Sequence, residues 1–369
     1  MKVTYEMLRE AIASPLAGEG EVHEWSTDSR EDQAGVLFVA LRGERFDGHD
    51  FVSTAFAQGA KAAIVDHLIE GAGGAQIVVP DTLTALQKVA AVAREEWTGT
   101  VVGVTGSAGK TSTKEAIAAL LSAAMLVGKT VGNLNNHIGL PLSILRVPSN
   151  ARAAVLEMGM NHAGEIAALS KIAKPDIGVV TNVGMAHVEN FEGIEGIAAA
   201  KRELIDGLRP GGTAVLNADD PYVAAMLREG KTETFGLSEG AKTRAKNVSY
   251  SRDGSAFEID GQAFHSKVPG RIGVINIAAG VAVARLWGIP LRQLAEAAHQ
   301  IVVPKMRFER IERDGMLIWN DCYNSNPDAA KAMLDVLRDT AEGRQIAVLG
   351  EMLELGHRAE TLHLSLIHI

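Results

Sequence analysis

One Gly-rich segment restricts the fold of this chain more than any other part of the sequence. Residues 101–113 read Val-Val-Gly-Val-Thr-Gly-Ser-Ala-Gly-Lys-Thr-Ser-Thr, so an apolar run ends in a turn that contains Gly106 and Gly109. Lys114–Leu121 follows with the composition of a helix. Glycines let the backbone approach an anion closely, and the free amides at a helix start favour phosphate. The segment therefore predicts a strand, a phosphate-binding loop and a helix, and with them ATP binding.

The residues of this loop have separate expected roles. Lys110 is placed to neutralise the β- and γ-phosphates, and the Thr111 hydroxyl to bind Mg²⁺. Val104 stands where the general P-loop pattern has its first glycine, so the remaining motif is T-G-x-x-G-K-T. The alternative, a Gly-rich turn that binds no nucleotide, leaves the Lys-Thr pair unexplained. The expected ATP-binding residues of the loop are Thr105, Gly106, Ser107, Ala108, Gly109, Lys110, Thr111 and Ser112.

Composition limits the classes of protein that remain. The chain has 369 residues, enough for two or three domains, and 47% hydrophobic with 22% charged residues is typical of a soluble globular protein. A net charge of −9 argues against general nucleic-acid binding. The single cysteine, Cys322, excludes an intrachain disulfide and a Cys-rich zinc site. Without a signal-peptide pattern or an apolar run of about 18 residues, we expect a cytoplasmic protein with no membrane span.

Strands and helices alternate through the middle of the chain, which predicts βαβ units and a mostly parallel sheet with its active residues at the carboxyl ends of the strands. The fold class is therefore α/β. The expected strands are Val101–Thr105, Ala153–Glu157, Ile177–Thr181 and Thr213–Asn217, and the expected helices include Gly164–Ile172 and Ile194–Gly207.

Three domains are expected: a first domain over residues 1–81, a central domain over residues 82–306 and a partial third domain over residues 307–369. Within the central domain, Lys246–Lys267 has short alternating runs typical of a small antiparallel addition. About 60 residues form the third domain, fewer than the roughly 100 of an ordinary domain, so we expect a fragment or a foreign tail. Its expected elements are a hairpin (Phe308–Arg313 and Met316–Asn320), a helix (Asp328–Thr340) and a strand (Gln345–Leu349).

Several polar residues follow predicted strands. Glu157 ends one strand and has the oxygen chemistry of a Mg²⁺ ligand, although a solvated loop carboxylate would look the same. His187 lies shortly after the next strand, where either a ligand or a structural histidine fits. Lys201 lies on a helix and by spacing alone would be a surface lysine. The segments 132–141 and 321–327 are dense in Asn and read as ligand loops, or for the first of them as a plain turn.

Taken together, these segments resemble the Mur ligase family, the ATP-dependent amide-forming enzymes of peptidoglycan synthesis. The resemblance extends from Thr27 to about His363. Residues 105–111 match the family's ATP loop, and Asp-Cys-Tyr-Asn-Ser-Asn-Pro at 321–327 resembles the D-x-Y-N-x-N-P signature of the members that add a dipeptide. The other matching segments are 27–30, 37–43 and 46–51 for a UDP-sugar-binding first domain, 132–142 and 156–166 for the central domain, and 348–356 for the third.

The resemblance implies a three-domain architecture with a central P-loop-type sheet and an incomplete Rossmann-like third domain. It also implies a monomeric ligase that joins D-alanyl-D-alanine to UDP-N-acetylmuramoyl-tripeptide with ATP and two Mg²⁺ ions. The alternatives are a truncated chain that only binds ATP and UDP-sugar, a ligase that adds the third amino acid, and a folate-type polyglutamate ligase. The signature at 321–327 disfavours the last two.

The resemblance assigns roles to four groups of residues, some of which the residue patterns above already single out. Lys110, Lys201 and His187 would be catalytic, with Lys201 carbamylated. The metal ligands would be Thr111, Glu157, His187 and Lys201; the further nucleotide contacts would be Asn276, Arg307 and Asp321; the substrate contacts would be Ser29, Arg30, Asp47, Gly48, His49, Asn135 and Asn136. One departure is that Ile272 and Gly273 stand where the family often has His-Asn near its adenine-contacting asparagine.

Overall fold

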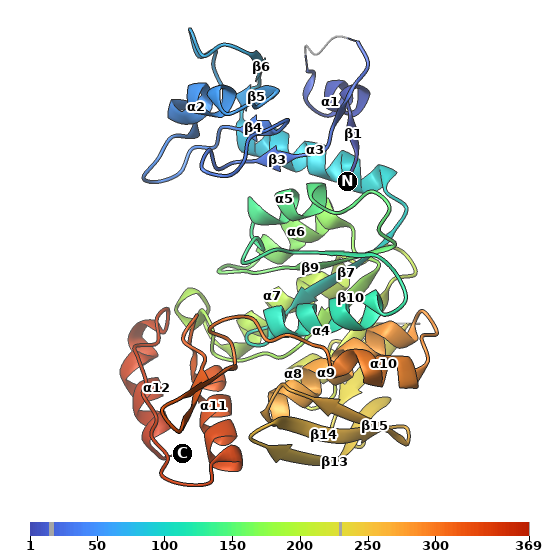
Figure 1. Ribbon diagram of the computed structural model, residues 1–369, viewed down its shortest axis with the longest axis vertical. Coiled ribbons are helices and arrows are strands. Elements are labelled where there is room, and N and C mark those ends of the chain that lie inside the picture. Colours follow the sequence, from blue (N-terminus) through green and yellow to red (C-terminus); the bar gives the residue numbers. More distant parts are fainter. Residues whose placement is uncertain (15–17, 229–230, 369) are drawn as a thin grey trace.

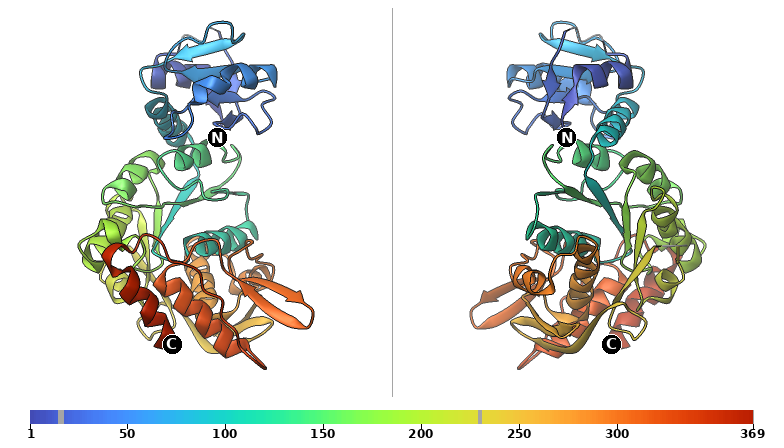
Figure 2. Two further views of the ribbon diagram at one scale, coloured as in Figure 1. Left: turned by 90° about the vertical axis from the view of Figure 1, so that its left-hand side faces the viewer. Right: turned by 90° about the vertical axis from the view of Figure 1, so that its right-hand side faces the viewer.

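The computed structural model describes residues 1–14, 18–228 and 231–368. The molecule is elongated, with an N-terminal part at one end, a large central sheet, and the C-terminal residues packed beside the far end of that sheet (Figure 1). In both side views the N-terminal part joins the rest through a narrow waist (Figure 2). Within the described residues, no helix combines the length and the apolar character needed to cross a membrane.

The N-terminal part contains a four-stranded parallel sheet and a two-stranded antiparallel pair. The elements are β1 (Val3–Thr4), α1 (Tyr5–Ile12), β2 (Glu21–Val22), β3 (Trp25–Ser26), β4 (Leu37–Val39), the 3₁₀ turn η1 (Gly48–Phe51), α2 (Val52–Ala57), β5 (Ala62–Val65) and β6 (Ala75–Val78).

The central sheet has nine strands in the order β15-β14-β13-β12-β11-β10-β7-β9-β8. The strands from β8 to β13 pair in parallel, and β13, β14 and β15 pair antiparallel, which confirms the predicted antiparallel addition. The strands are β7 (Thr100–Thr105), β8 (Val127–Lys129), β9 (Ala153–Glu157), β10 (Ile177–Val180), β11 (Thr213–Asn217), β12 (Thr232–Gly236), β13 (Thr243–Ser251), β14 (Gly254–Ile259) and β15 (Gln262–Ser266).

Helices cover both faces of this sheet, because its parallel strands are apolar on both sides. On one face pack α4 (Lys110–Ser122), α9 (Gly270–Arg285) and α10 (Leu291–Ala298). On the other pack α3 (Thr82–Glu96), α5 (Gly139–Leu145), α6 (Glu165–Ala173), α7 (Ile194–Asp206) and the short α8 (Pro221–Ala224). The hydrophobic core beneath this second set of helices continues into the N-terminal part, where it includes Trp25 and Leu37.

The C-terminal residues form a hairpin and two helices, and the hairpin and the first of these helices confirm the predictions. They are β16 (Glu309–Arg313), β17 (Met316–Asn320), α11 (Pro327–Thr340) and α12 (Ala359–Ser365). The strand predicted at Gln345–Leu349 is wrong, since residues 345–350 have no regular structure and Val348 is 92% exposed. An apolar β-branched run becomes a strand only when a neighbouring strand takes its backbone hydrogen bonds, and no described strand pairs with this one.

Candidate active site

The Gly-rich loop lies between β7 and α4, at the carboxyl edge of the central sheet, as the sequence predicts. Gly109 precedes the helix with φ of 76°, and Gly106 has φ of 155°. A Cβ at Gly106 would lie 1.8 Å from Thr181 Oγ1, so no other residue fits there without displacing the neighbouring loop. Gly109 is thus required by its backbone conformation, and Gly106 by close packing.

A second loop, following β10, holds the Gly-rich loop in place. Asn182 accepts a hydrogen bond from Ala108 N at 2.8 Å and donates one to Ala108 O at 3.0 Å. The Thr181 hydroxyl also donates to Ala108 O at 2.7 Å. Ser107 Oγ donates to Gly184 O at 3.0 Å and accepts from Gly184 N at 2.8 Å. These contacts fix the loop backbone before any phosphate binds, which is the preorganisation that an anion site needs.

Behind the loop, the first turn of α4 meets the end of β9. Thr111 Oγ1 donates to Glu157 Oε2 at 2.9 Å, and Asn135 Nδ2 donates to Glu157 Oε1 at 2.8 Å. Glu157 is 2% exposed. A hydroxyl and a carboxylate, both adjacent to a phosphate-binding loop, are the hard oxygen donors that Mg²⁺ binds. The donor set therefore fits the metal that the sequence implied.

Two buried residues that sequence reasoning missed support Glu157. Lys114 Nζ donates to Thr130 O at 2.8 Å and lies 3.9 Å from Glu157 Oε2, while Thr130 Oγ1 accepts from Glu157 N at 3.0 Å. Lys114 is 1% exposed. The sequence spacing could have revealed Lys114, because it lies on the same buried face of α4 as Ile117 and Leu121. A charged residue on a buried face requires a polar partner.

Two lysines with lowered pKa values follow: Lys110, on which the charge of Glu157 acts, and Lys201, on which the charge of Lys110 acts. Lys110 Nζ donates to Gly106 O at 2.8 Å. Burial lowers the pKa of Lys110 below its ordinary value, and the charge of Glu157 offsets only part of that shift. Lys201 is 1% exposed on α7, and burial, together with the charge of Lys110, lowers its pKa well below the ordinary value. No hydrogen bond or ion pair of the Lys201 ammonium occurs within the described ranges. The surface-lysine alternative for Lys201 is therefore wrong.

His187 lies where the C-terminal residues meet the central sheet. Its ring Nδ1 is 2.5 Å from Glu354 Oε2, and burial lowers its pKa while Glu354 opposes that shift. Its backbone has φ of 61°. Nearby, Met185 N donates to Asp328 Oδ2 at 3.0 Å. The loop that contains His187 is thus held from the C-terminal side by two carboxylates that sequence reasoning did not single out.

Asn276 lines a small cavity next to α4. Its Oδ1 accepts from Thr113 Oγ1 at 2.9 Å, whereas its Nδ2 is buried and has no hydrogen-bond partner among the described residues. Buried polar groups usually have a hydrogen-bond partner, so this amide is free to donate to a bound ligand or water. The cavity is lined by residues that include Ser112, Gly273, Val303 and Phe308.

Arg307 and Asp321 lie at the start of the C-terminal part. The Arg307 guanidinium stacks 4.2 Å from the centre of the Tyr323 ring. Asp321 Oδ1 accepts from Phe308 N at 3.0 Å, and burial raises the pKa of Asp321 to about 6. The positive charge of Arg307 also lowers the pKa of Lys110 in the phosphate-binding loop.

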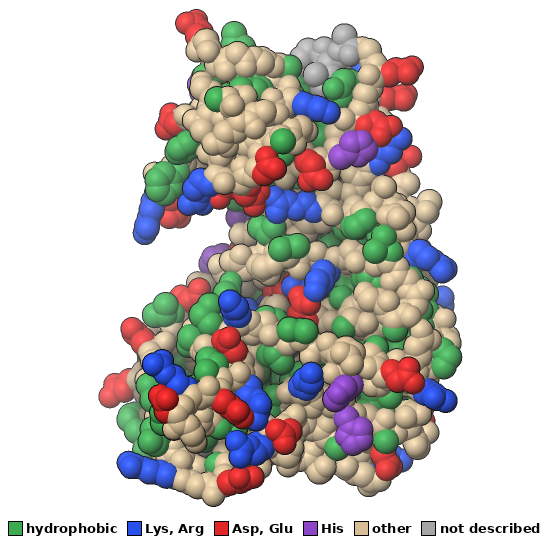
Figure 3. Space-filling model, in the orientation of Figure 1, with side chains coloured by type: hydrophobic (Ala, Val, Ile, Leu, Met, Phe, Trp, Pro, Cys, Tyr) green, Lys and Arg blue, Asp and Glu red, His purple; other side chains and the backbone are tan. Residues whose placement is uncertain are grey.

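The predicted sugar-nucleotide residues lie on loops that follow β3 and β4, on the N-terminal side of the open notch that Figure 3 shows. His49 is 4% exposed, and its ring contacts Asp47 at Nδ1 (2.5 Å) and Asp66 N at Nε2 (3.0 Å). Both ring nitrogens are therefore engaged within the protein. A Cβ at Gly48 would lie 2.7 Å from Leu41 N, so this glycine allows two loops to pack closely.

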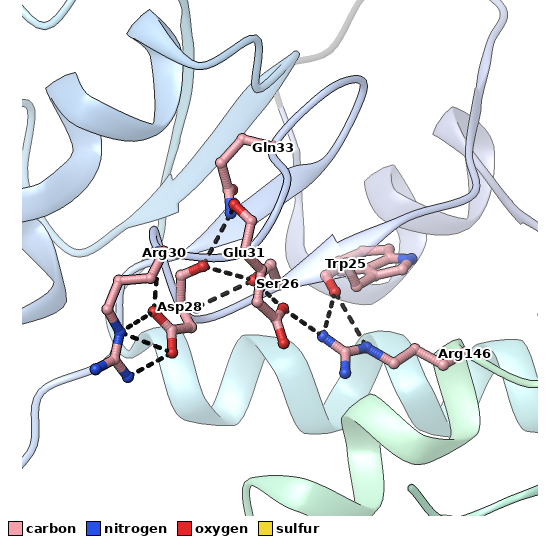
Figure 4. A network of polar contacts seen from close by, with 7 residues as sticks. All are labelled: Trp25, Ser26, Asp28, Arg30, Glu31, Gln33 and Arg146. Atoms are coloured by element: carbon pink, nitrogen blue, oxygen red, sulfur yellow. Dashed lines mark hydrogen bonds and ion pairs between the residues drawn. The ribbon is translucent and has the colours of Figure 1, made fainter.

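The loop after β3 is a compact hydrogen-bonded turn (Figure 4). Arg30 pairs with Asp28 at 2.6 Å and its side chain is 89% exposed, whereas Ser29 is buried. Gln33 Nε2 donates to Asp28 O at 2.9 Å. Figure 4 also shows Arg146, which reaches this loop from the end of α5 in the central part.

The fold and the site define a P-loop-type nucleotide-binding protein in which a buried carboxylate and lysine back the phosphate loop. Family models match three stretches: the Mur ligase family catalytic domain at residues 21–94, the Mur ligase middle domain at residues 104–284, and the Mur ligase glutamate ligase domain at residues 306–368. The chain belongs to the Mur ligase family.

Individual relatives match along nearly the whole chain. The UDP-N-acetylmuramoyl-tripeptide–D-alanyl-D-alanine ligase of Bacillus subtilis is 40% identical over 365 residues, which cover 97% of this chain and 79% of the relative. The crystal structure of MurF from Acinetobacter baumannii superposes with a TM-score of 0.90 at 33% identity, covering 99% of this chain and 83% of that one. The MurF ligase of Thermotoga maritima in complex with ADP gives 0.80 at 35% identity, covering 94% and 81%.

Proposed function

We propose that this chain is an ATP-dependent, ADP-forming ligase that joins D-alanyl-D-alanine to UDP-N-acetylmuramoyl-tripeptide in peptidoglycan precursor synthesis. The observation that carries the proposal is the match over 97% of the chain to a ligase with this reaction in its name. The Asp321–Pro327 signature supports the dipeptide over a single amino acid. The cytoplasmic location and the monomeric state predicted above belong to this proposal.

The reaction proceeds through an acyl phosphate. A carboxylate oxygen of the tripeptide attacks the γ-phosphorus of ATP, the bond to the β-phosphate oxygen breaks, and ADP leaves. The amine of the dipeptide then attacks the acyl carbon, phosphate leaves with the bonding electron pair, and the amine loses a proton as the amide forms. Closure of the three parts around the substrates keeps water from the acyl phosphate.

Charge repulsion is the main barrier to the first step, because a carboxylate approaches a triphosphate. Lys110 lies at the phosphate loop and spreads the γ-phosphate charge, and the loop amides bind the phosphates. Mg²⁺ bound to Thr111, Glu157, His187 and a carbamylated Lys201 would supply further charge neutralisation. The carbamate is supported by burial and a lowered pKa at Lys201, because only the neutral amine adds CO₂.

The remaining residues position the substrates. The unpaired Asn276 amide is suited to an acceptor nitrogen of adenine, and Arg307 and Asp321 contact the nucleotide from the C-terminal side. Ser29, Arg30, Asp47 and Gly48 contribute to the UDP-sugar site, with His49 holding the loop from within. Asn135 and Asn136 face the peptide end.

Phosphate release measured with UDP-N-acetylmuramoyl-tripeptide and ATP, with and without D-alanyl-D-alanine, tests the proposal. We expect release that depends on the dipeptide, and its loss in Lys110→Ala. Equal release with and without the dipeptide, or none while ATP and UDP-sugar still bind, would contradict the proposed reaction.

A further inference from the structure

Arg146, at the C-terminal end of α5, contacts the N-terminal part at two places. Its Nη2 donates to Glu31 Oε2 at 2.8 Å and to Trp25 O at 3.1 Å, across 115 and 121 residues of sequence (Figure 4). The Arg146 side chain is 29% exposed and that of Glu31 is 49% exposed. A guanidinium that binds a carboxylate and a carbonyl together fixes both the distance and the orientation of the two elements.

Glu31 connects Arg146 to the loop that precedes Glu31 in sequence. The carboxylate oxygen that accepts from Arg146 also accepts from Ser26 Oγ at 2.8 Å. Ser26 Oγ in turn lies 3.1 Å from Asp28 O and accepts from Asp28 N at 3.0 Å. Gln33, which is fully buried, donates to the carbonyls of both Asp28 and Glu31. The segment Ser26–Gln33 is thus a closed hydrogen-bonded unit with Arg146 as its support from the central part.

The opposite end of α5 begins at the active site. Asn136 Oδ1 accepts from Gly139 N at 2.9 Å at the start of the helix, and the preceding Asn135 binds Glu157. Leu140, Ile144 and Leu145 are fully buried, so α5 is packed rigidly between the two ends. One short helix is therefore connected through Asn135 to the proposed metal ligand Glu157 before its start, and through Arg146 to the Ser26–Gln33 unit at its end.

From this arrangement we infer that Arg146 is a positioning residue for the sugar nucleotide. The inference rests on the proposed function, which assigns Ser29 and Arg30 to the UDP-sugar. Through Glu31, Arg146 holds these two residues at a set distance from the phosphate loop. The UDP end of the substrate is then placed so that its peptide carboxylate reaches the γ-phosphate. Without the guanidinium, the unit is free to shift on α5, and substrate binding must order it again.

Arg146→Gln, Arg146→Lys and the control Arg152→Gln test the inference. Arg152 is exposed and lies seven residues after Leu145, the last residue of α5; its side chain makes no hydrogen bond or ion pair within the described residues. Two readouts are used: hydrogen exchange of residues 26–33 without ligand, and titration with UDP-N-acetylmuramoyl-tripeptide, with ADP titration as the reference.

For Arg146→Gln we expect faster exchange in residues 26–33, a Kd for the UDP-tripeptide raised about five- to tenfold, and unchanged ADP affinity. Arg146→Lys should recover part of the affinity, because its ammonium still reaches Glu31 but not Trp25 O as well. Equal exchange and equal Kd in Arg146→Gln and Arg152→Gln would overturn the inference and leave the proposed function intact. Failure of the unmodified chain to bind the UDP-tripeptide, with ADP still bound, would overturn both.

Discussion

The hydroxyl of Thr111 and the carboxylate of Glu157 lie 2.9 Å apart, although 46 residues separate them in sequence. They meet because β7 and β9 are neighbours in the sheet, so that the turn after β7 and the end of β9 share one edge. This pairing places a buried oxygen donor directly behind the phosphate loop. A metal ion bound there would contact the phosphates and the protein at once.

Replacing Glu157 tests that placement. Glu157→Gln keeps the size of the side chain but removes the charge, so we expect ATP-dependent phosphate release to fall by about 100-fold or more. Binding of Mn²⁺ in the presence of ADP, followed by electron paramagnetic resonance, should weaken in parallel. The exposed Glu70→Gln serves as the control. Activity within about twofold of that of the unmodified chain would show that Glu157 is not a metal ligand.

Gly106 should be intolerant of any side chain. A Cβ would lie 1.8 Å from Thr181 Oγ1, so we expect Gly106→Ala to lose ADP binding in a calorimetric titration. The matched control is Gly211→Ala, where φ is 78° and no atom lies within 4 Å of the added Cβ. That variant should lose only about 1 kcal/mol of stability and bind ADP normally. Normal ADP binding by Gly106→Ala would show that the loop is not as constrained as the packing indicates.

The partly buried carboxyl of Asp321 predicts a pH dependence of stability. Its pKa is raised from 3.8 to about 6, so the folded protein retains a proton that the unfolded chain has already lost. Stability should therefore fall as the pH rises from about 4 to about 6 and remain lower above that range. Asp321→Asn, which does not titrate, should be more stable at neutral pH by about 2 kcal/mol in urea unfolding. The same pH profile in both proteins would contradict this assignment, and Asp50→Asn is the exposed control.

Arg94 is a structural arginine between α3 and the central sheet. It is fully buried, donates to Ala173 O at 2.8 Å and Trp97 O at 2.9 Å, and pairs with Asp176 at 2.8 Å. Arg94→Met should cost about 3–5 kcal/mol in chemical unfolding, because it removes the donor to the buried carbonyls of Ala173 and Trp97 and the cation beside Asp176. Arg202→Met, which breaks only an exposed contact on α7, should cost less than about 0.5 kcal/mol. Equal losses in the two variants would show that burial does not control the effect.

Sequence reasoning predicted best where one local pattern determined the structure. The strands at Ala153–Glu157 and Thr213–Asn217 occur at their predicted bounds, because each is an apolar run ended by a polar residue. The helix α5 was missed, since Gly139 and Pro141 read as a loop. Proline is tolerated in a first helical turn, where its missing N–H has no acceptor to lose.

Contacts between distant segments explain what sequence reasoning could not predict. The strand at Gln345–Leu349 depended on a pairing partner, and its residues alone do not specify one. The support of Glu31 by Arg146 depends on how two parts of the chain dock. The contact between Thr111 and Glu157 could have been predicted from the sequence, because both residues lie at the ends of predicted parallel strands and the carboxyl ends of such strands share one edge.

Mass spectrometry of the reaction product tests the central claim most directly. The chain is incubated with ATP, UDP-N-acetylmuramoyl-tripeptide and D-alanyl-D-alanine. We predict a product whose mass is that of the tripeptide substrate plus the dipeptide less one water, with one ADP formed for each product molecule. Binding of ATP and the UDP-tripeptide without any such product would contradict the assignment of this chain as the dipeptide-adding ligase.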